Sequence, residues 1–252
     1  MEEILIYPAG CTDAILYASD QLKRKKIPLV DHPTPEVTHL LLDVPSFAAD
    51  GMLRCGGTIE ALLERLPAGI TVVGGNLVHP ALAGYPALDL LRDADYLAAN
   101  AAVTADCALQ AAAPQMKTAF SDSPALVIGW GRIGKCLGQL LRSIGTEVTI
   151  AARKDSDRAM LRALGYDAAD AENLTDILPR FRLIFNTAPN PVLSTEQLAL
   201  CKNCVKIDLA SKPGMDGNDV IWAKGLPGVY APESSGRLIA EAFLRLYKEG
   251  PK

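Results

Sequence analysis

Short apolar runs alternate with stretches of helical periodicity along the whole chain. Strands of a parallel sheet covered on both faces are apolar throughout, whereas amphipathic helices repeat apolar residues every three or four positions. The alternation of the two patterns therefore predicts an α/β fold built on parallel sheets. In the first hundred residues we expect strands at Ile4–Tyr7, Ile27–Val30, His39–Val44, Ile70–Val73 and Tyr96–Ala99, and helices at Asp13–Lys23 and Thr58–Leu66.

A second series of the same kind begins after the polar stretch Ser121–Pro124. Its expected strands are Ala125–Gly129, Glu147–Ala151, Leu183–Asn186, Val205–Leu209 and Val229–Ala231, and its expected helices are Ile133–Ile144, Asp155–Leu164 and Asn173–Leu178.

Two longer helical patterns, Thr104–Lys117 and Ser234–Lys248, bracket this second series. In two-domain dehydrogenases, bracketing helices carry the chain from one domain to the other and back. We therefore expect two Rossmann-like parallel-sheet domains with an interdomain cleft. The N-terminal substrate domain would comprise residues 1–102 and be joined by a C-terminal helix at 234–252. Residues 103–233 would form the cofactor domain.

Composition and net charge argue against several classes of protein. The chain has 252 residues, is 49% hydrophobic and carries a net charge of −4, which gives no support to binding of nucleic acid or of a membrane surface. No apolar stretch approaches the roughly 20 residues of a membrane span. Its six cysteines are scattered, as in reduced cytosolic proteins, and Cys201 and Cys204 lack the second pair that a metal site needs. We expect a cytoplasmic protein without a metal.

The clearest chemical signal is a GxGxxG motif, Gly129-Trp130-Gly131-Arg132-Ile133-Gly134, placed between a buried strand and an amphipathic helix. Gly129 permits a tight turn, Gly131 allows a pyrophosphate to approach the backbone, and Gly134 allows close helix packing. The N–H groups that open the helix attract phosphate. This context predicts that a dinucleotide binds residues 129–134.

The strand that follows ends at Ala152-Arg153-Lys154, where an NAD enzyme usually has an acidic residue for the ribose hydroxyls. Two cations without a carboxylate favour the 2′-phosphate of NADP, with NAD as the alternative. At the ends of two later strands, Thr187, Ala188 and Pro189 leave room for the nicotinamide ribose, and Asp208 and Lys212 would lie at the edge where α/β sheets bind ligands.

These motifs resemble the A subunit of dipicolinate synthase from spore-forming bacteria. The resemblance rests on five ordered blocks over residues 104–247: the glycine motif, Ala152-Arg153, Asn186–Pro189, Ile207–Gly214 and Gly225–Ala240, with Thr104–Cys107 ahead of them. More distantly, the layout is similar to that of alanine dehydrogenases.

The resemblance implies a two-domain NADP-dependent oxidoreductase that converts a cyclic dihydro- or tetrahydrodipicolinate-type dicarboxylate to dipicolinate. It also implies a partner, the flavoprotein-like B subunit, together with a role in sporulation and a homo-oligomer. Within it we assign Lys212 as the carboxylate anchor, Ser211 and Ser235 as hydrogen-bonding groups, and Thr104, at an expected helix start, as a neighbour of the nicotinamide. Thr104 and Ser235 are also good helix caps.

The chain departs from the family pattern at Glu233-Ser-Ser-Gly236, where relatives have Lys-Thr-Ala-Gly, and at Met215, where they have Gly. Its first hundred residues match poorly. Two alternatives therefore stay open: an imine or amino-acid dehydrogenase that uses NADP, and a nucleotide-binding regulatory subunit without catalysis.

Overall fold

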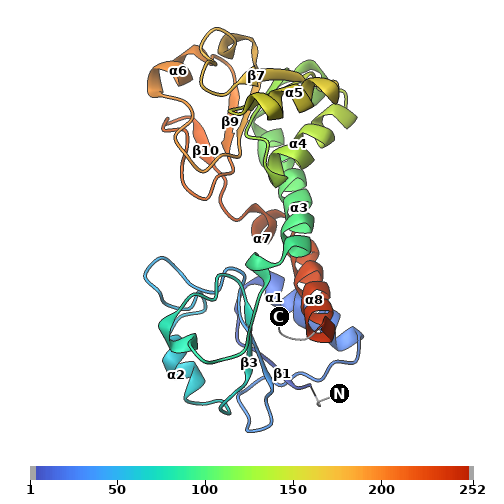
Figure 1. Ribbon diagram of the computed structural model, residues 1–252, viewed down its shortest axis with the longest axis vertical. Coiled ribbons are helices and arrows are strands. Elements are labelled where there is room, and N and C mark those ends of the chain that lie inside the picture. The colour runs from blue at the N-terminus through green and yellow to red at the C-terminus, as the bar shows by residue number, and fades with distance from the viewer. Residues whose placement is uncertain (1–3, 250–252) are drawn as a thin grey trace. The chain divides into compact units, whose positions relative to one another are not determined.

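The computed structural model describes residues 4–249 and divides the chain into two compact units. Unit 1 comprises Met1–Asn100 and Pro227–Lys252, and unit 2 comprises Ala101–Leu226. Both are built on parallel sheets (Figure 1), so the predicted α/β class with two Rossmann-like domains is confirmed. Within residues 4–249, no helix has the length and apolar character needed to cross a membrane.

Unit 1 contains a four-stranded parallel sheet in the order β1-β2-β3-β4. Leu29 forms an isolated parallel bridge with Ile6 beside β1, so the predicted strand at Ile27–Val30 is reduced to one bridge. With this segment counted, the order is that of flavodoxin-like sheets. The elements are β1 (Ile6–Pro8), α1 (Asp13–Arg24), β2 (His39–Leu41), α2 (Ile59–Leu63), β3 (Thr71–Gly74), β4 (Ala87–Asp89) and α8 (Pro232–Glu249).

The two ends of the chain meet in unit 1, where α1 and α8 lie side by side (Figure 1). A Cβ atom at Gly236 would lie 2.5 Å from the carbonyl oxygen of Ala14, so the two backbones can approach only because residue 236 is glycine. Ile239 and Phe243 of α8 join the core of this unit. The predicted C-terminal helix extended to residue 252, and its last three residues lie outside the described range.

Unit 2 contains a six-stranded parallel sheet in the order β10-β9-β8-β5-β6-β7. The chain leaves β5 towards β7 on one side and later returns to β8 on the other, so the strand order reverses between β5 and β8. The elements of this unit are β5 (Ala125–Ile128), α4 (Arg132–Ser143), β6 (Val148–Ala152), α5 (Asp155–Ala163), β7 (Asp167–Asp170), β8 (Leu183–Asn186), α6 (Thr195–Leu200), β9 (Val205–Asp208) and β10 (Val220–Trp222). Two helices cross the unit boundaries in the sequence: α3 (Ala94–Ala112) begins in unit 1 and ends in unit 2, and α7 (Leu226–Tyr230) begins at the last residue of unit 2 and continues in unit 1.

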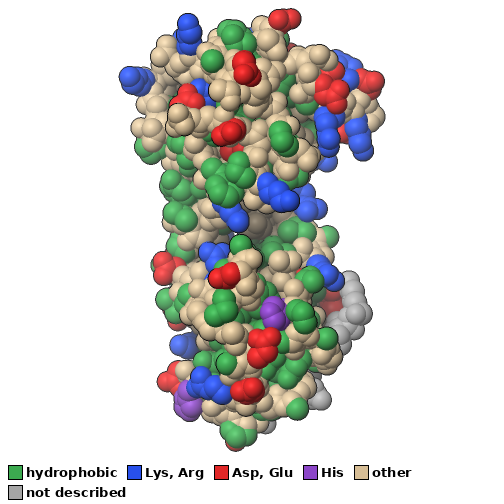
Figure 2. Space-filling model, turned by 90° about the vertical axis from the view of Figure 1, so that its left-hand side faces the viewer, with side chains coloured by type: hydrophobic (Ala, Val, Ile, Leu, Met, Phe, Trp, Pro, Cys, Tyr) green, Lys and Arg blue, Asp and Glu red, His purple; other side chains and the backbone are tan. Residues whose placement is uncertain are grey.

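The charged side chains on the face of the protein shown in Figure 2 are of both signs, and they are interspersed among hydrophobic and other residues.

The predicted strand Tyr96–Ala99 is wrong, because these residues belong to helix α3. The Asp93 carboxylate accepts a hydrogen bond from the backbone N–H of Tyr96 at 2.7 Å, which caps the helix start. The alanine-rich sequence that follows favours a helix. Thr104 consequently lies in the middle of α3, not at its start as predicted.

Two other predicted elements are also wrong. Val229–Ala231 is not a strand, since α7 runs to Tyr230 and the side chain of Val229 is exposed. Asn173–Leu178 forms turns followed by a short 3-10 helix at Leu178–Arg180. There the Asp170 carboxylate accepts hydrogen bonds from the Glu172 N–H and the Asn173 amide, which stabilises a turn in place of a helix.

Candidate functional site

The three motif glycines occupy three different environments at the carboxyl end of β5. Gly129 has a φ of 109°, a value that favours glycine. A Cβ atom at Gly134 would lie 2.1 Å from the carbonyl oxygen of Gly129, so α4 packs directly on the turn. A Cβ atom at Gly131 would have no heavy atom within 4 Å. The turn is therefore closed on the protein side and open at Gly131.

Helix α4 begins at this opening with free backbone donors. Gly131 is its N-cap and provides no side-chain hydrogen bond, and its first turn contains no acidic residue. Four N–H groups at a helix start have no partner inside the helix, and together with the helix dipole they attract an anion. The other motif residues lie around these N–H groups: Arg132 is exposed and Ile133 is half-buried. The Trp130 ring packs edge-on against that of Tyr166, with ring centroids 5.9 Å apart.

At the end of β6, Ala152 is buried, and the side chains of Arg153 and Lys154 are exposed. Neither cation forms an ion pair within the described residues. A third cation, Arg158, was missed from the sequence. Its guanidinium donates to the carbonyl oxygens of Ala152 at 2.8 Å and Arg153 at 2.6 Å. Arg158 therefore fixes the backbone that presents the two free cations.

One acidic residue beside this strand end is Asp170, which pairs in register with Ala152. The backbone N–H of Glu172, the amide of Asn173 and the guanidinium of Arg158 hold the pKa of Asp170 below its usual value. Its carboxylate lies 3.2 Å from Arg158. The same guanidinium also pairs with Asp155, so Arg158 is shared by two carboxylates, and Arg153 and Lys154 are the cations of this strand end that remain available to an anion.

The loop after β8 lies against the glycine turn. The N–H of Thr187 donates to the carbonyl oxygen of Ile128 at 2.8 Å, and its hydroxyl donates to the same oxygen at 3.0 Å. A Cβ atom at Gly129 would lie 2.4 Å from this hydroxyl oxygen. Ala188 is half-buried and Pro189 is exposed. The residues predicted for the nicotinamide side thus lie beside those predicted for the pyrophosphate.

Asp208 organises the next loop from a fully buried position. Its carboxylate accepts hydrogen bonds from the N–H groups of Ala210 at 3.0 Å, Gly214 at 2.7 Å and Met215 at 3.0 Å, and from the Asn186 amide at 3.0 Å. Four donors saturate its oxygens, so Asp208 shapes the loop and exposes no carboxylate to a ligand.

The same loop explains the surroundings of Gly214 and Met215. A Cβ atom at Gly214 would lie 2.5 Å from the carbonyl oxygen of Asn190. Met215, for which the resemblance predicted a glycine, is buried and packs in the apolar core beside Leu193. Met215 therefore contributes to the core of unit 2 and does not face solvent.

The four residues predicted to be catalytic have different surroundings. Ser211 and Lys212 are exposed on the loop that Asp208 holds, and Lys212 forms no ion pair within residues 4–249. Thr104 is buried in α3. Ser235 belongs to α8 of unit 1, and its hydroxyl is buried with no hydrogen-bond partner in the described chain. Only Ser211 and Lys212 lie on the same sheet edge as the glycine turn.

Unit 1 has its own loop cluster at the carboxyl ends of its strands. Asp43 is buried, and its carboxylate accepts hydrogen bonds from the N–H groups of Cys11 at 3.2 Å and Thr12 at 3.1 Å. Asp43 thereby caps the start of α1, as an anion would. Burial raises the pKa of the nearby Cys11 and Cys55 thiols, with Asp43 as the next cause in each case.

The Cys201 and Cys204 pair lies at the other edge of the unit 2 sheet, next to β9. Burial raises the pKa of Cys201, and it raises that of Cys204 to about 12. Both thiols are therefore protonated near neutral pH and are poor nucleophiles.

Comparison with known proteins found no matching family model. Among curated proteins, the chain is similar to the A subunit of dipicolinate synthase from Bacillus subtilis, with 23% identity in an alignment of 237 residues that covers 86% of this chain and 80% of that protein. Among solved structures, it is similar to the same B. subtilis subunit (TM-score 0.81, 20% identity, 99% of this chain and 97% of that one). It is also similar to the corresponding subunit from Bacillus halodurans (TM-score 0.84, 20% identity, 98% of both chains).

The wider fold similarity extends to dehydrogenases. An L-alanine dehydrogenase matches with a TM-score of 0.67 and 11% identity over 96% of this chain and 79% of that one. An NAD-complexed D-isomer-specific 2-hydroxyacid dehydrogenase from Lactobacillus delbrueckii matches with a TM-score of 0.56 and 11% identity over 98% of both chains. Over most of its length in sequence and nearly all of it in fold, the chain is similar to the A subunits of dipicolinate synthase.

Proposed function

We propose that the chain is an NADP-dependent oxidoreductase that oxidises a dihydro- or tetrahydrodipicolinate-type dicarboxylate to dipicolinate. The observation that carries the proposal is the glycine turn, where Gly131 opens onto empty space at the uncapped start of α4. The dehydrogenase folds similar to this chain, one of them described as complexed with NAD, support a nicotinamide cofactor.

The residues at the edge between β5 and β8 fit such a dinucleotide. The N–H groups at the start of α4 would hold its pyrophosphate, and Thr187, Ala188 and Pro189 would line its nicotinamide side. The cofactor would supply a hydride acceptor when bound.

Arg153 and Lys154 support NADP over NAD. Both are exposed, both lack an ion-pair partner within the described chain, and Arg158 holds the backbone beneath them. A 2′-phosphate would therefore find two available cations where NAD enzymes usually have a carboxylate.

Lys212 is our proposed anchor for a substrate carboxylate. It is exposed, it forms no ion pair within the described residues, and it lies on the same edge of the unit 2 sheet as the glycine turn. Ser211 precedes it and would donate a hydrogen bond to the same substrate. Thr104 and Ser235 stay proposed contacts. The unpartnered buried hydroxyl of Ser235 is consistent with that role. We also propose a flavoprotein-like B subunit for the partner, because the name of the similar B. subtilis protein denotes one subunit of a synthase.

Glu233 is the residue that tests the proposed substrate class. It is exposed in the first turn of α8 and forms no ion pair with the described residues of unit 1. A carboxylate in the first turn favours a helix through the helix dipole. If Glu233 also faces the substrate, it repels a dianion by about 3 kcal/mol per charge at 5 Å and an effective dielectric near 20, less with solvent screening.

Purified protein should be incubated with NADP⁺ and freshly generated hydroxytetrahydrodipicolinate, and dipicolinate measured by its ultraviolet absorbance. We expect weak turnover by the natural sequence and a gain on Glu233→Lys. Strong turnover that Glu233→Lys leaves unchanged would place Glu233 outside the site. No turnover by either protein, together with intact NADPH binding, would instead favour another imine or amino-acid substrate or a regulatory subunit.

A further inference from the structure

The amino edge of the unit 2 sheet, opposite the edge that carries the glycine turn, contains a cavity of about 790 Å³. It is formed where β8, β9 and β10 begin and where the chain leaves α3, and every lining residue belongs to unit 2. Small-molecule sites in proteins commonly have volumes of about 300–1,000 Å³. Neither the motifs nor the proposed oxidoreductase activity uses this cavity.

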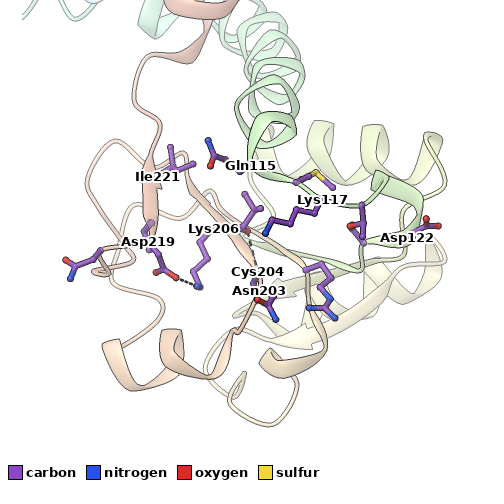
Figure 3. A pocket seen from close by; sticks show the side chains of 15 residues that line it. Gln115, Lys117, Asp122, Asn203, Cys204, Lys206, Asp219 and Ile221 are labelled. Carbon is purple, nitrogen blue, oxygen red and sulfur yellow. Dashed lines mark hydrogen bonds and ion pairs between the residues drawn. The ribbon is translucent and has the colours of Figure 1, made fainter.

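A buried lysine lies in its wall. The Lys206 side chain on β9 is only 2% exposed, and its ammonium lies 2.5 Å from the carboxylate of Asp219 (Figure 3). An ammonium has three N–H donors, and Asp219 is its only acceptor within residues 4–249. Since a buried charge is costly unless it is fully hydrogen-bonded, two of its donors remain to be satisfied from the cavity.

Two further cations line the cavity from other segments. Lys117 follows α3 and extends across towards the start of β9 (Figure 3), and Arg182 precedes β8. Neither side chain has an ion-pair partner in the part of the chain that the structure describes. Asp122 is the one carboxylate in the lining besides Asp219, which Lys206 already neutralises. Positive charge therefore exceeds negative charge here, although the whole chain has a net charge of −4.

We propose that this cavity binds a small organic anion through a carboxylate or phosphate group. The two remaining donors of Lys206 hold the anionic group at the wall, and Lys117 and Arg182 neutralise it. Val220 and Ile221 offer apolar surface to the carbon skeleton of the ligand. The site is separate from the proposed cofactor site, because it lies at the amino ends of the strands and the glycine turn lies at the carboxyl end of β5.

Titration of the full-length protein with inorganic phosphate or with succinate, followed by ¹H–¹⁵N NMR at constant ionic strength, tests this site. We expect amide shifts at 203–206 and 218–221 that saturate with a Kd of about 1 mM or tighter for at least one probe. Saturation by phosphate alone identifies a phosphate ligand, and saturation by succinate identifies a carboxylate ligand.

The double variant Lys117→Ala/Arg182→Ala should weaken this binding by about tenfold or more, because it removes both unpaired cations. Arg162→Ala, which removes an exposed cation on α5, is the matched control and should leave the Kd unchanged. Shifts that never saturate, shifts confined to residues 129–134, or an unchanged Kd in the double variant would overturn the proposal. Since both replaced residues belong to connecting segments, an NMR spectrum with native dispersion will verify that the double variant is folded.

Discussion

Arg153 is the side chain on which the proposed cofactor preference depends most. It is exposed, unpaired within residues 4–249, and held at the end of β6 by the guanidinium of Arg158. Arg153→Ala removes charge-assisted hydrogen bonds worth about 1.5–3 kcal/mol to the 2′-phosphate. NADPH binding should therefore weaken by roughly ten- to a hundredfold, with NADH binding nearly unchanged, in calorimetric titrations. An equal loss for both cofactors would show that Arg153 does not contact the 2′-phosphate.

Substitutions at Gly131 and Gly134, only three residues apart, should have different effects: one on dinucleotide binding, the other on stability. Gly131→Val should abolish dinucleotide binding and retain the fold, because its side chain enters the empty space where the pyrophosphate would lie. Gly134→Ala should lower the melting temperature, since its Cβ atom would lie 2.1 Å from a backbone oxygen. Thermal melts and NADPH titration of both variants separate the two effects. A folded Gly131→Val protein that still binds NADPH would place the phosphate site elsewhere.

At the scale of elements, the contact of α1 with α8 depends on Gly236. A Cβ atom there would lie 2.5 Å from the Ala14 carbonyl oxygen and the Tyr17 Cβ atom, so Gly236→Ala should destabilise the protein by about 1–3 kcal/mol through overpacking. Gly228→Ala in α7 is the control, because its Cβ atom would meet nothing within 4 Å. Chemical denaturation measures both. Equal stability of the two variants would contradict the close packing.

At the scale of the whole molecule, the two units differ in how the chain builds them. Unit 2 is continuous, and one of its core clusters lies entirely between Leu126 and Met215. Unit 1 is discontinuous, because Ile239 and Phe243 of α8 fill its core. We therefore expect a fragment of residues 94–226 to melt cooperatively and to bind NADPH. A fragment of residues 1–100, which keeps the core residue Tyr96, should not fold until a peptide of residues 227–252 is added.

Circular dichroism melts of the fragments, alone and mixed, check this expectation. A cooperative transition of residues 1–100 alone would show that α8 is dispensable for the core of unit 1.

Much of the fold and part of the candidate site could be predicted from the sequence. The α/β class, the glycine turn between β5 and α4, and the C-terminal helix follow from local signals: apolar runs, glycine spacing and helical periodicity. The elements that were assigned wrongly or missed from the sequence are those whose local pattern does not match their structure. β7 has the sequence Asp-Ala-Ala-Asp, with no β-branched or aromatic residue, and is a strand only because it pairs with β6. The apolar run Tyr96–Ala99 has the pattern of a strand in the sequence, but in the structure the Asp93 side chain caps a helix at this point.

Only the tertiary structure decided which polar groups face each other. Asp208 ends a strand where a cofactor ligand is expected, yet four donors from the folded loop saturate its carboxylate. Lys206 lies between two apolar residues of β9, and its burial beside Asp219 is visible only when β9 pairs with β10. Sequence records local propensity and spacing, whereas burial, charge pairing and hydrogen-bond saturation arise between residues that the fold brings together.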